Sequence, residues 1–269
     1  MVQDWFAVDY SLYIWCCIYI THTMIKELIL FYKDPYSFLN SGVEDSINEQ
    51  LRILKFAFVF CMASTLTISL LLACIESILS LGFNISVLKN LSTKREEFHA
   101  ANTAWNAVVK VVVMAPFAEE FLFRWLLVTK SRIINAIIFT FLLEYIFQDI
   151  FQLPISSWWY MLIILLIFIA VIAGDSLSGK HYLPVFERSG YNYLCWALTL
   201  AFALAHVGNF APLNWSLFYI YPFYVLPQFV YGIVSSYLAV RYNSVVWPFL
   251  LHAAINLTAE VLTLISHIS

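Results

Sequence analysis

Charged side chains are scarce in this chain of 269 residues. Only 12% of the residues are Asp, Glu, Lys or Arg, whereas 62% are hydrophobic. A soluble domain carries roughly 25% charged residues to cover its surface, so this composition excludes a water-soluble protein. It also excludes a disordered chain, because so much apolar surface must be buried. The class that remains is a protein that crosses the membrane several times.

Several motifs that would identify other functions are also missing. The five cysteines include no C-x-x-C pair, which favours small core residues over a disulfide framework or a zinc site. Neither the serine-hydrolase pattern G-x-S-x-G nor the zinc-protease pattern H-E-x-x-H occurs. The formal net charge of −3 provides no basic patch, so nucleic acid is not an expected partner. No lysine or arginine precedes Lys26, which does not fit the pattern of a cleavable signal peptide.

Long apolar runs, in contrast, are abundant, and a run of about 20 residues predicts a membrane-spanning helix. About eight spans are predicted on this basis. They cover 10–32, 56–75, 103–130, 132–150, 158–174, two helices within 189–240 that separate near 208–214, and 242–259. The polar segments 33–52 and 82–102 are predicted to be loops. The predicted fold is therefore an all-α multipass transmembrane bundle that forms one integral membrane domain over residues 1–269.

The third predicted span contains three ionisable residues, Glu119, Glu120 and Arg124. An ionisable side chain inside a membrane span is costly, which makes it a candidate functional residue by default. Glu120 and Arg124 are four positions apart, so they can pair on one face of a helix. Glu119 lies about 100° further round the helix and has no such partner. The structural alternative is that both acids pair with basic residues elsewhere in the bundle.

Two histidines lie inside later uncharged spans. His206 follows alanine and leucine residues, and His252 shares a helix face with Asn256 four positions later. A lone histidine on an apolar helix is more often a core residue, but neither of these has a local charge to pair with. With Glu119 as general base, one histidine can hold a water, and the other can stabilise an oxyanion together with the asparagine amide. This set predicts hydrolysis of a peptide bond without a nucleophilic side chain.

Two alternatives remain open on these residues alone. Glu119, His206 and His252 are also possible zinc ligands, although Asn256 would then have no role as a ligand. A non-enzymatic membrane protein could use the acids as a proton or ligand pathway. A transporter of that kind is expected to contain inverted repeats, and none is found in the sequence. Glu260, four positions after Asn256, is a candidate for holding the Asn256 amide.

The three elements together resemble the CPBP family, the CAAX proteases and bacteriocin-processing enzymes, which is also called the Abi family. Its motifs E-E-x-x-x-R, F-x-x-x-H and H-x-x-x-N/D occur here in the same order, as Glu119-Glu120 with Arg124, Phe202 with His206, and His252 with Asn256. The resemblance covers residues 103–262 in two blocks. It implies a membrane-embedded glutamic endopeptidase that acts on a CAAX-type or precursor peptide, without a metal or other cofactor.

The resemblance also implies a role for each motif residue. Glu119 and His206 would activate water, and His252 and Asn256 would stabilise the oxyanion. Glu120 would contribute to the site as a further catalytic residue. Arg124 and Phe202 would support it.

One departure from the family pattern is large. Glu119 and His206 are 87 positions apart, whereas family members usually place the second motif a few tens of residues after the first. The insertion, residues 131–188, is predicted to add two helices, which return the chain to the same side of the membrane. The expected partners are a peptide or protein substrate and the lipid bilayer, and the expected location is a prokaryotic plasma (inner) membrane. No oligomeric state is predicted.

Overall fold

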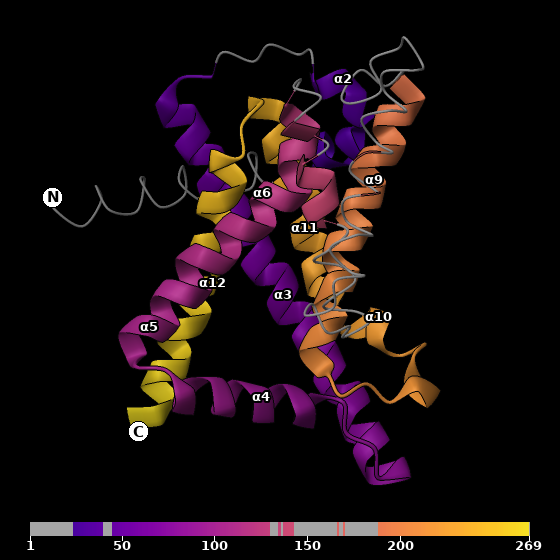
Figure 1. Ribbon diagram of the computed structural model, residues 1–269, viewed down its shortest axis with the longest axis vertical. Coiled ribbons are helices and arrows are strands. Elements are labelled where there is room, and N and C mark those ends of the chain that lie inside the picture. The colour runs from indigo at the N-terminus through magenta and orange to yellow at the C-terminus, as the bar shows by residue number, and fades with distance from the viewer. Residues whose placement is uncertain are drawn as a thin grey trace, which may run out of the picture.

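A computed structural model describes residues 24–39, 45–129, 134–135, 137–142, 166, 169 and 188–268. Every secondary-structure element in this part of the chain is helical, as the all-α class predicts (Figure 1). The elements are α2 (Pro35–Leu39), α3 (Ile47–Phe83), α4 (Leu88–Ala101), α5 (Ala104–Val108), η1 (Val109–Met114), α6 (Ala115–Val128), α9 (Arg188–Ala205), η2 (His206–Phe210), η3 (Trp215–Leu217), α10 (Tyr221–Tyr224), α11 (Leu226–Tyr242) and α12 (Val246–Ile268). Residues 24–33 form a further helix before α2.

Within the described residues, three helices are long and apolar enough to cross a bilayer. They are α3, α9 continued by η2 as far as Phe210, and α12 as far as Ile265. Helix α11 and the joined α5, η1 and α6 pack with them in the same bundle. Of the spans predicted at 132–150 and 158–174, the structure describes only residues 134–135, 137–142, 166 and 169, and most of the span at 10–32 lies outside the described residues. The multipass helical bundle is therefore confirmed, while the number of spans stays a prediction.

The prediction of a loop over residues 82–102 is wrong, because most of this segment forms helix α4. Helix α3 ends at Asn84 in a left-handed conformation with φ 53°. Helix α4 then runs across the lower ends of α3 and α12 (Figure 1). Glu76 of α3 fixes the turn, since it accepts hydrogen bonds from the Leu88 backbone N–H at 3.1 Å and the Tyr224 hydroxyl at 2.5 Å. No residue of α4 itself is fully buried, and its few apolar residues, such as Leu88 and Leu91, are only partly buried, so the predominantly polar sequence gives little sign of a helix.

The third predicted span is a helix with a π-helical segment, formed by α5, η1 and α6 in succession. Pro116 gives the physical reason, because proline has no N–H and its ring clashes with the carbonyl four residues earlier. In the wider turn, the Ala115 N–H donates to the Lys110 carbonyl five residues back. The corresponding donor for Val111 would be residue 116, which is the proline. Asn256 of α12 donates to the Val111 carbonyl instead, at 2.9 Å from its Nδ2.

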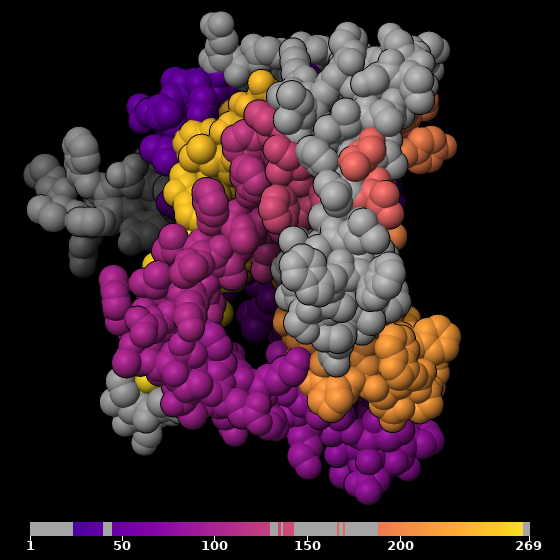
Figure 2. Space-filling model, viewed as in Figure 1, coloured from indigo at the N-terminus to yellow at the C-terminus, as the bar shows by residue number. Residues whose placement is uncertain are grey.

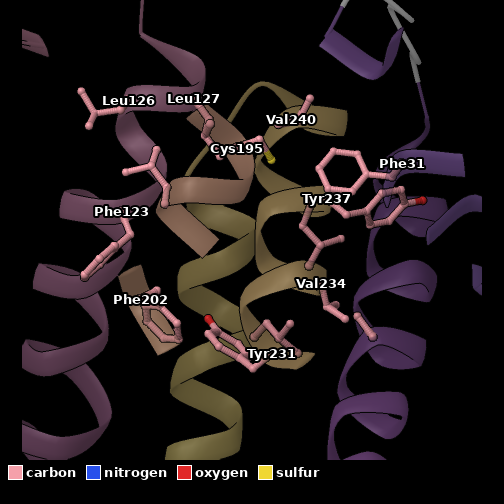
Figure 3. Packing of buried hydrophobic residues seen from close by; sticks show 14 of the residues in the cluster. Phe31, Phe123, Leu126, Leu127, Cys195, Phe202, Tyr231, Val234, Tyr237 and Val240 are labelled. Atoms are coloured by element: carbon pink, nitrogen blue, oxygen red, sulfur yellow. The ribbon is translucent and has the colours of Figure 1, made fainter. Parts of the chain in front are cut away.

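The apolar core lies between α3, α6, α9 and α11 (Figure 3). Helices α9 and α11 approach closely because small residues line their contact. A Cβ placed on Gly232 would lie 3.3 Å from the Thr199 methyl group. The hydroxyl oxygens of Thr199 and Ser236 are 3.0 Å apart. Phe202 and Tyr231 lie at the lower end of the cluster drawn in Figure 3, which is where the core meets the candidate site.

Ion pairs hold the ends of α9 and α11 that lie away from the candidate site. Arg241 near the end of α11 pairs with Glu27 and, at 3.1 Å, with Asp45 just before α3. At the start of α9, the Arg188 guanidinium hydrogen-bonds to Asp34 and lowers the pKa of that carboxyl below its ordinary value. These contacts connect the start of α9 and the end of α11 to the segments that precede α2 and α3.

Candidate active site

Four of the predicted site residues line one cavity although they come from three separate segments. Glu119 lies on α6, His206 opens η2, and His252 and Asn256 lie on α12. The cavity has a volume of about 650 Å³. Figure 2 shows the hollow between α4 and the joined α5 and η1, with α3 visible in its depth. The structure therefore brings together residues that the sequence separates by up to 137 positions, from Glu119 to Asn256.

Glu119 and His206 face each other across 3.6 Å, measured from Oε2 to Nε2. His206 immediately follows the last residue of α9, and its Nδ1 lies 2.8 Å from the Phe202 carbonyl oxygen. A carbonyl oxygen can only accept, so Nδ1 carries a proton, and Nε2 presents a lone pair in the neutral form of the ring. A single water molecule can donate one hydrogen bond to this nitrogen and the other to the Glu119 carboxylate.

His252 lies between the two glutamates of the first motif. Its Nδ1 is 2.9 Å from Glu120 Oε1, and its Nε2 is 3.8 Å from Glu119 Oε2. The Tyr231 hydroxyl donates to the same Glu120 oxygen at 2.8 Å. Glu120 is only 1% exposed, so these contacts hold its carboxylate in a dry environment. Glu120 therefore fixes the orientation of the His252 ring and directs its Nε2 toward Glu119.

Glu120 and Arg124 pair as their spacing predicts. Arg124 Nε lies 3.6 Å from Glu120 Oε2, and both side chains are buried. The same nitrogen donates to the Ser235 hydroxyl at 2.8 Å, and the guanidinium carbon lies 4.4 Å from the centre of the Phe202 ring. Phe202 thus contacts both Arg124 and, through its carbonyl, His206. Of the two acids, only Glu120 has a lysine or arginine partner. Within the described residues, Glu119 approaches two histidines and no lysine or arginine.

Asn256 has one amide N–H engaged and one left for a ligand. Its Nδ2 donates to the Val111 carbonyl of η1, and a side-chain amide carries two N–H groups. Glu260, which the spacing offered as a partner for Asn256, instead lies with its Oε1 3.7 Å from His99 Nδ1 on α4. The π-helical segment, and not Glu260, therefore holds the Asn256 amide. Segments of this kind are frequent at functional sites.

Sequence analysis missed three polar residues of α11 that surround the site. Tyr231 contacts Glu120, Ser235 contacts Arg124, and Gln228 lines the cavity with a buried Oε1 that has no hydrogen-bond partner among the described residues. The signal was present in their spacing of three and four positions, which places them on one face of an otherwise apolar helix.

The geometry also bears on the zinc alternative. A tetrahedral zinc ion with bonds of about 2.0–2.1 Å holds its ligand atoms about 3.3–3.4 Å apart. Glu119 Oε2 is 3.6 Å from His206 Nε2 and 3.8 Å from His252 Nε2, and both separations are slightly wider than that between such ligands. In the part of the chain that the structure describes, no group of three or more His, Cys, Asp or Glu residues is arranged to hold a metal ion.

Comparison with known proteins assigns the family. Residues 101–258 match the family described as type II CAAX prenyl endopeptidase Rce1-like. The match covers more than half of the chain and contains all three motifs, from Glu119 to Asn256. No curated protein and no solved structure matches the chain significantly. The family match agrees with the CPBP resemblance of the motifs, and this chain therefore belongs to the type II CAAX prenyl endopeptidase Rce1-like family.

Proposed function

We propose that this protein hydrolyses a peptide bond by the attack of a water molecule that Glu119 and His206 activate. Family membership makes it a membrane CAAX protease, whose substrate is a peptide or protein. The observation that carries the finer proposal is the distance of 3.6 Å between Glu119 Oε2 and His206 Nε2 inside a cavity large enough for a peptide. When His206 Nε2 is unprotonated, both atoms are acceptors, and one water molecule can donate a hydrogen bond to each.

The reaction begins when the water oxygen attacks the scissile carbonyl carbon. Glu119 accepts a proton from the water as the new C–O bond forms, and His206 holds the water in line. Glu119 then passes this proton to the leaving amide nitrogen as the C–N bond breaks. The products are a new carboxylate on one fragment and a new amine on the other. No covalent enzyme intermediate is required.

The oxyanion that forms between these two steps is stabilised by His252 and Asn256. Asn256 offers the amide N–H that Val111 does not use. His252 can donate from Nε2 when its ring carries both protons, and that ring lies between the carboxylates of Glu119 and Glu120. Glu120 is thus a positioning residue for His252, and Arg124 in turn neutralises Glu120 in the apolar interior.

The substrate is a CAAX-type or precursor peptide, and the proposed location is a prokaryotic inner membrane. The experiment uses the purified full chain in liposomes with a prenylated peptide that ends in a C-a-a-X sequence, and it identifies the products by mass spectrometry. Cleavage that persists in the presence of a chelator is the expected result. Loss of cleavage on chelation and its return with zinc would establish the zinc protease instead. Binding of the peptide without any cleavage would favour the non-enzymatic alternative.

Asn256→Ala is expected to lower kcat by about 10²–10³-fold, because one oxyanion donor is lost. KM should change little, since the oxyanion exists only after attack on the carbonyl. The measurement is steady-state cleavage of the same peptide. Thr258→Ala is the matched control on α12, because among the described residues the Thr258 hydroxyl bonds only to the Ala254 carbonyl of its own helix. A raised KM with normal kcat in Asn256→Ala would contradict the oxyanion assignment.

A further inference from the structure

The cavity that holds Glu119 and His206 has a second wall, which the proposed chemistry does not use. Lys94 and Arg95 of α4 lie on this wall, and Lys110 of η1 lies beside it. Each of the three cations hydrogen-bonds only to neutral oxygens among the described residues: Lys94 Nζ to the Gly208 carbonyl at 3.0 Å, Arg95 Nη2 to the Ala259 carbonyl at 3.2 Å, and Lys110 Nζ to Asn102 Oδ1 at 2.7 Å. The wall therefore carries positive charge that is not neutralised by an ion pair in this part of the chain.

The contacts of Lys94 and Arg95 place these two cations close to the reacting groups. The carbonyl that Lys94 contacts belongs to the second residue after His206, and the carbonyl that Arg95 contacts belongs to the third residue after Asn256. Two or three residues span at most about 7–11 Å even when fully extended. Lys94 thus contacts the segment that begins with His206, and its neighbour Arg95 contacts the helix that carries Asn256.

The acids on the cavity wall do not neutralise these cations. Glu119 lies against His206 and His252, and Glu260 lies 3.7 Å from His99. An anionic group that enters the cavity beside Glu119 therefore meets a wall whose cations, Lys94 and Arg95 among them, are not neutralised by these acids. An arginine fork and a lysine ammonium are both well suited to a carboxylate.

We propose that Lys94 and Arg95 bind the free C-terminal carboxylate of the substrate, an inference that rests on the proposed function. A C-a-a-X sequence stands at the very end of its chain. A scissile bond next to the prenylated cysteine then has the terminal carboxylate three residues away, at most about 11 Å. That reach is of the same order as the two- and three-residue segments that join His206 and Asn256 to the carbonyls that Lys94 and Arg95 contact. The subsite selects peptides that end shortly after the scissile bond and disfavours cleavage inside a long chain.

The exposure of the two cations limits the expected effect. Both residues are exposed, so their charges are screened by solvent. Exposed ion pairs contribute little individually, and two of them together predict a preference of about tenfold for a carboxylate over a neutral terminus.

The test compares two prenylated peptides that differ only at the C-terminus, one with a free carboxylate and one with a carboxamide. The wild-type protein is expected to cleave the acid with a kcat/KM about tenfold higher than the amide. In the variant Lys94→Gln/Arg95→Gln this ratio should fall to about one, because cleavage of the acid loses its advantage. Lys89→Gln is the matched control, since Lys89 is an exposed lysine of α4 outside the cavity lining, and it should keep the wild-type ratio. Lys94→Arg, which retains the charge, should also keep it.

Several results would overturn the subsite. They are equal kcat/KM for both peptides in the wild type, an unchanged ratio in the double variant, or a proportional loss on both peptides. A proportional loss of kcat/KM on both peptides would indicate that the two cations hold α4 in place or bind lipid headgroups. Binding of the same peptides to Glu119→Gln separates the subsite from the chemistry. A preference for the acid in binding supports the subsite even if the wild type cleaves neither peptide, a failure that would refute the proposed function alone.

Discussion

Glu119→Gln is expected to lower kcat by about 10²–10⁴-fold while the protein still folds and binds its peptide. Glutamine has the shape and volume of glutamate, so the packing of α6 is retained. Its amide oxygen can still accept a hydrogen bond from water but cannot take up a proton at neutral pH. His206, 3.6 Å away, would then hold a water that no base activates. The measurement is the cleavage rate of a prenylated peptide in liposomes, together with the binding affinity of the same peptide.

The comparison needs a control with the same chemical change at an inert site. Glu97 of α4 is exposed and lies outside the cavity, so Glu97→Gln should cleave at the wild-type rate. His206→Ala should be about as slow as Glu119→Gln, because the same water loses its second acceptor. Wild-type turnover by Glu119→Gln would refute Glu119 as the general base. A fall in activity that follows the loss of bound zinc in both variants would support the metal alternative.

The motif residues could be predicted because a membrane interior gives a polar side chain few structural roles. An acid without a local partner in an apolar span, such as Glu119, must meet another polar group across the bundle. His206 and His252 are the two histidines well inside uncharged spans, and Asn256 shares a helix face with His252. The sequence could therefore indicate which residues meet in one cavity, although each motif alone is short.

The parts of the site that the sequence did not reveal depend on contacts between distant elements. Helix α4 is held largely by polar contacts with Glu76 and with carbonyls of η2 and α12, which its own predominantly polar sequence does not reveal. The Val111 carbonyl needs a donor because of Pro116, but only the folded structure places Asn256 beside it. Tyr231 is one of 16 tyrosines, and its role follows from its contact with Glu120 and not from its type.

Arg124→Met is expected to lower the free energy of unfolding by about 3–5 kcal/mol, because Glu120 would be left as a buried charge without its partner. The Arg124 side chain has no exposed surface and that of Glu120 has 1%, so water cannot replace the lost contact. The Ser235 hydroxyl would also lose the donor that it accepts from. The measurement is chemical or thermal unfolding of the purified protein in detergent. Arg52→Met is the matched control, since Arg52 pairs with Glu49 on the exposed face of α3 and should change stability by about 0–1 kcal/mol.

A double-mutant cycle separates the charge pair from the loss of arginine packing against Phe202. In Arg124→Met/Glu120→Gln both charges are absent, and the glutamine oxygen can still accept from Tyr231 and from His252. The double variant should therefore be more stable than Arg124→Met alone, with a coupling free energy of about 0.5–3 kcal/mol between the two sites. The double variant should nevertheless cleave the peptide slowly. A neutral glutamine at position 120 cannot stabilise the positive charge of the doubly protonated His252 that donates to the oxyanion. A double variant that is less stable than Arg124→Met would contradict the charge pair. It would show that Arg124 stabilises the fold mainly by packing, and that Glu120 does not need the Arg124 charge to be tolerated in the interior.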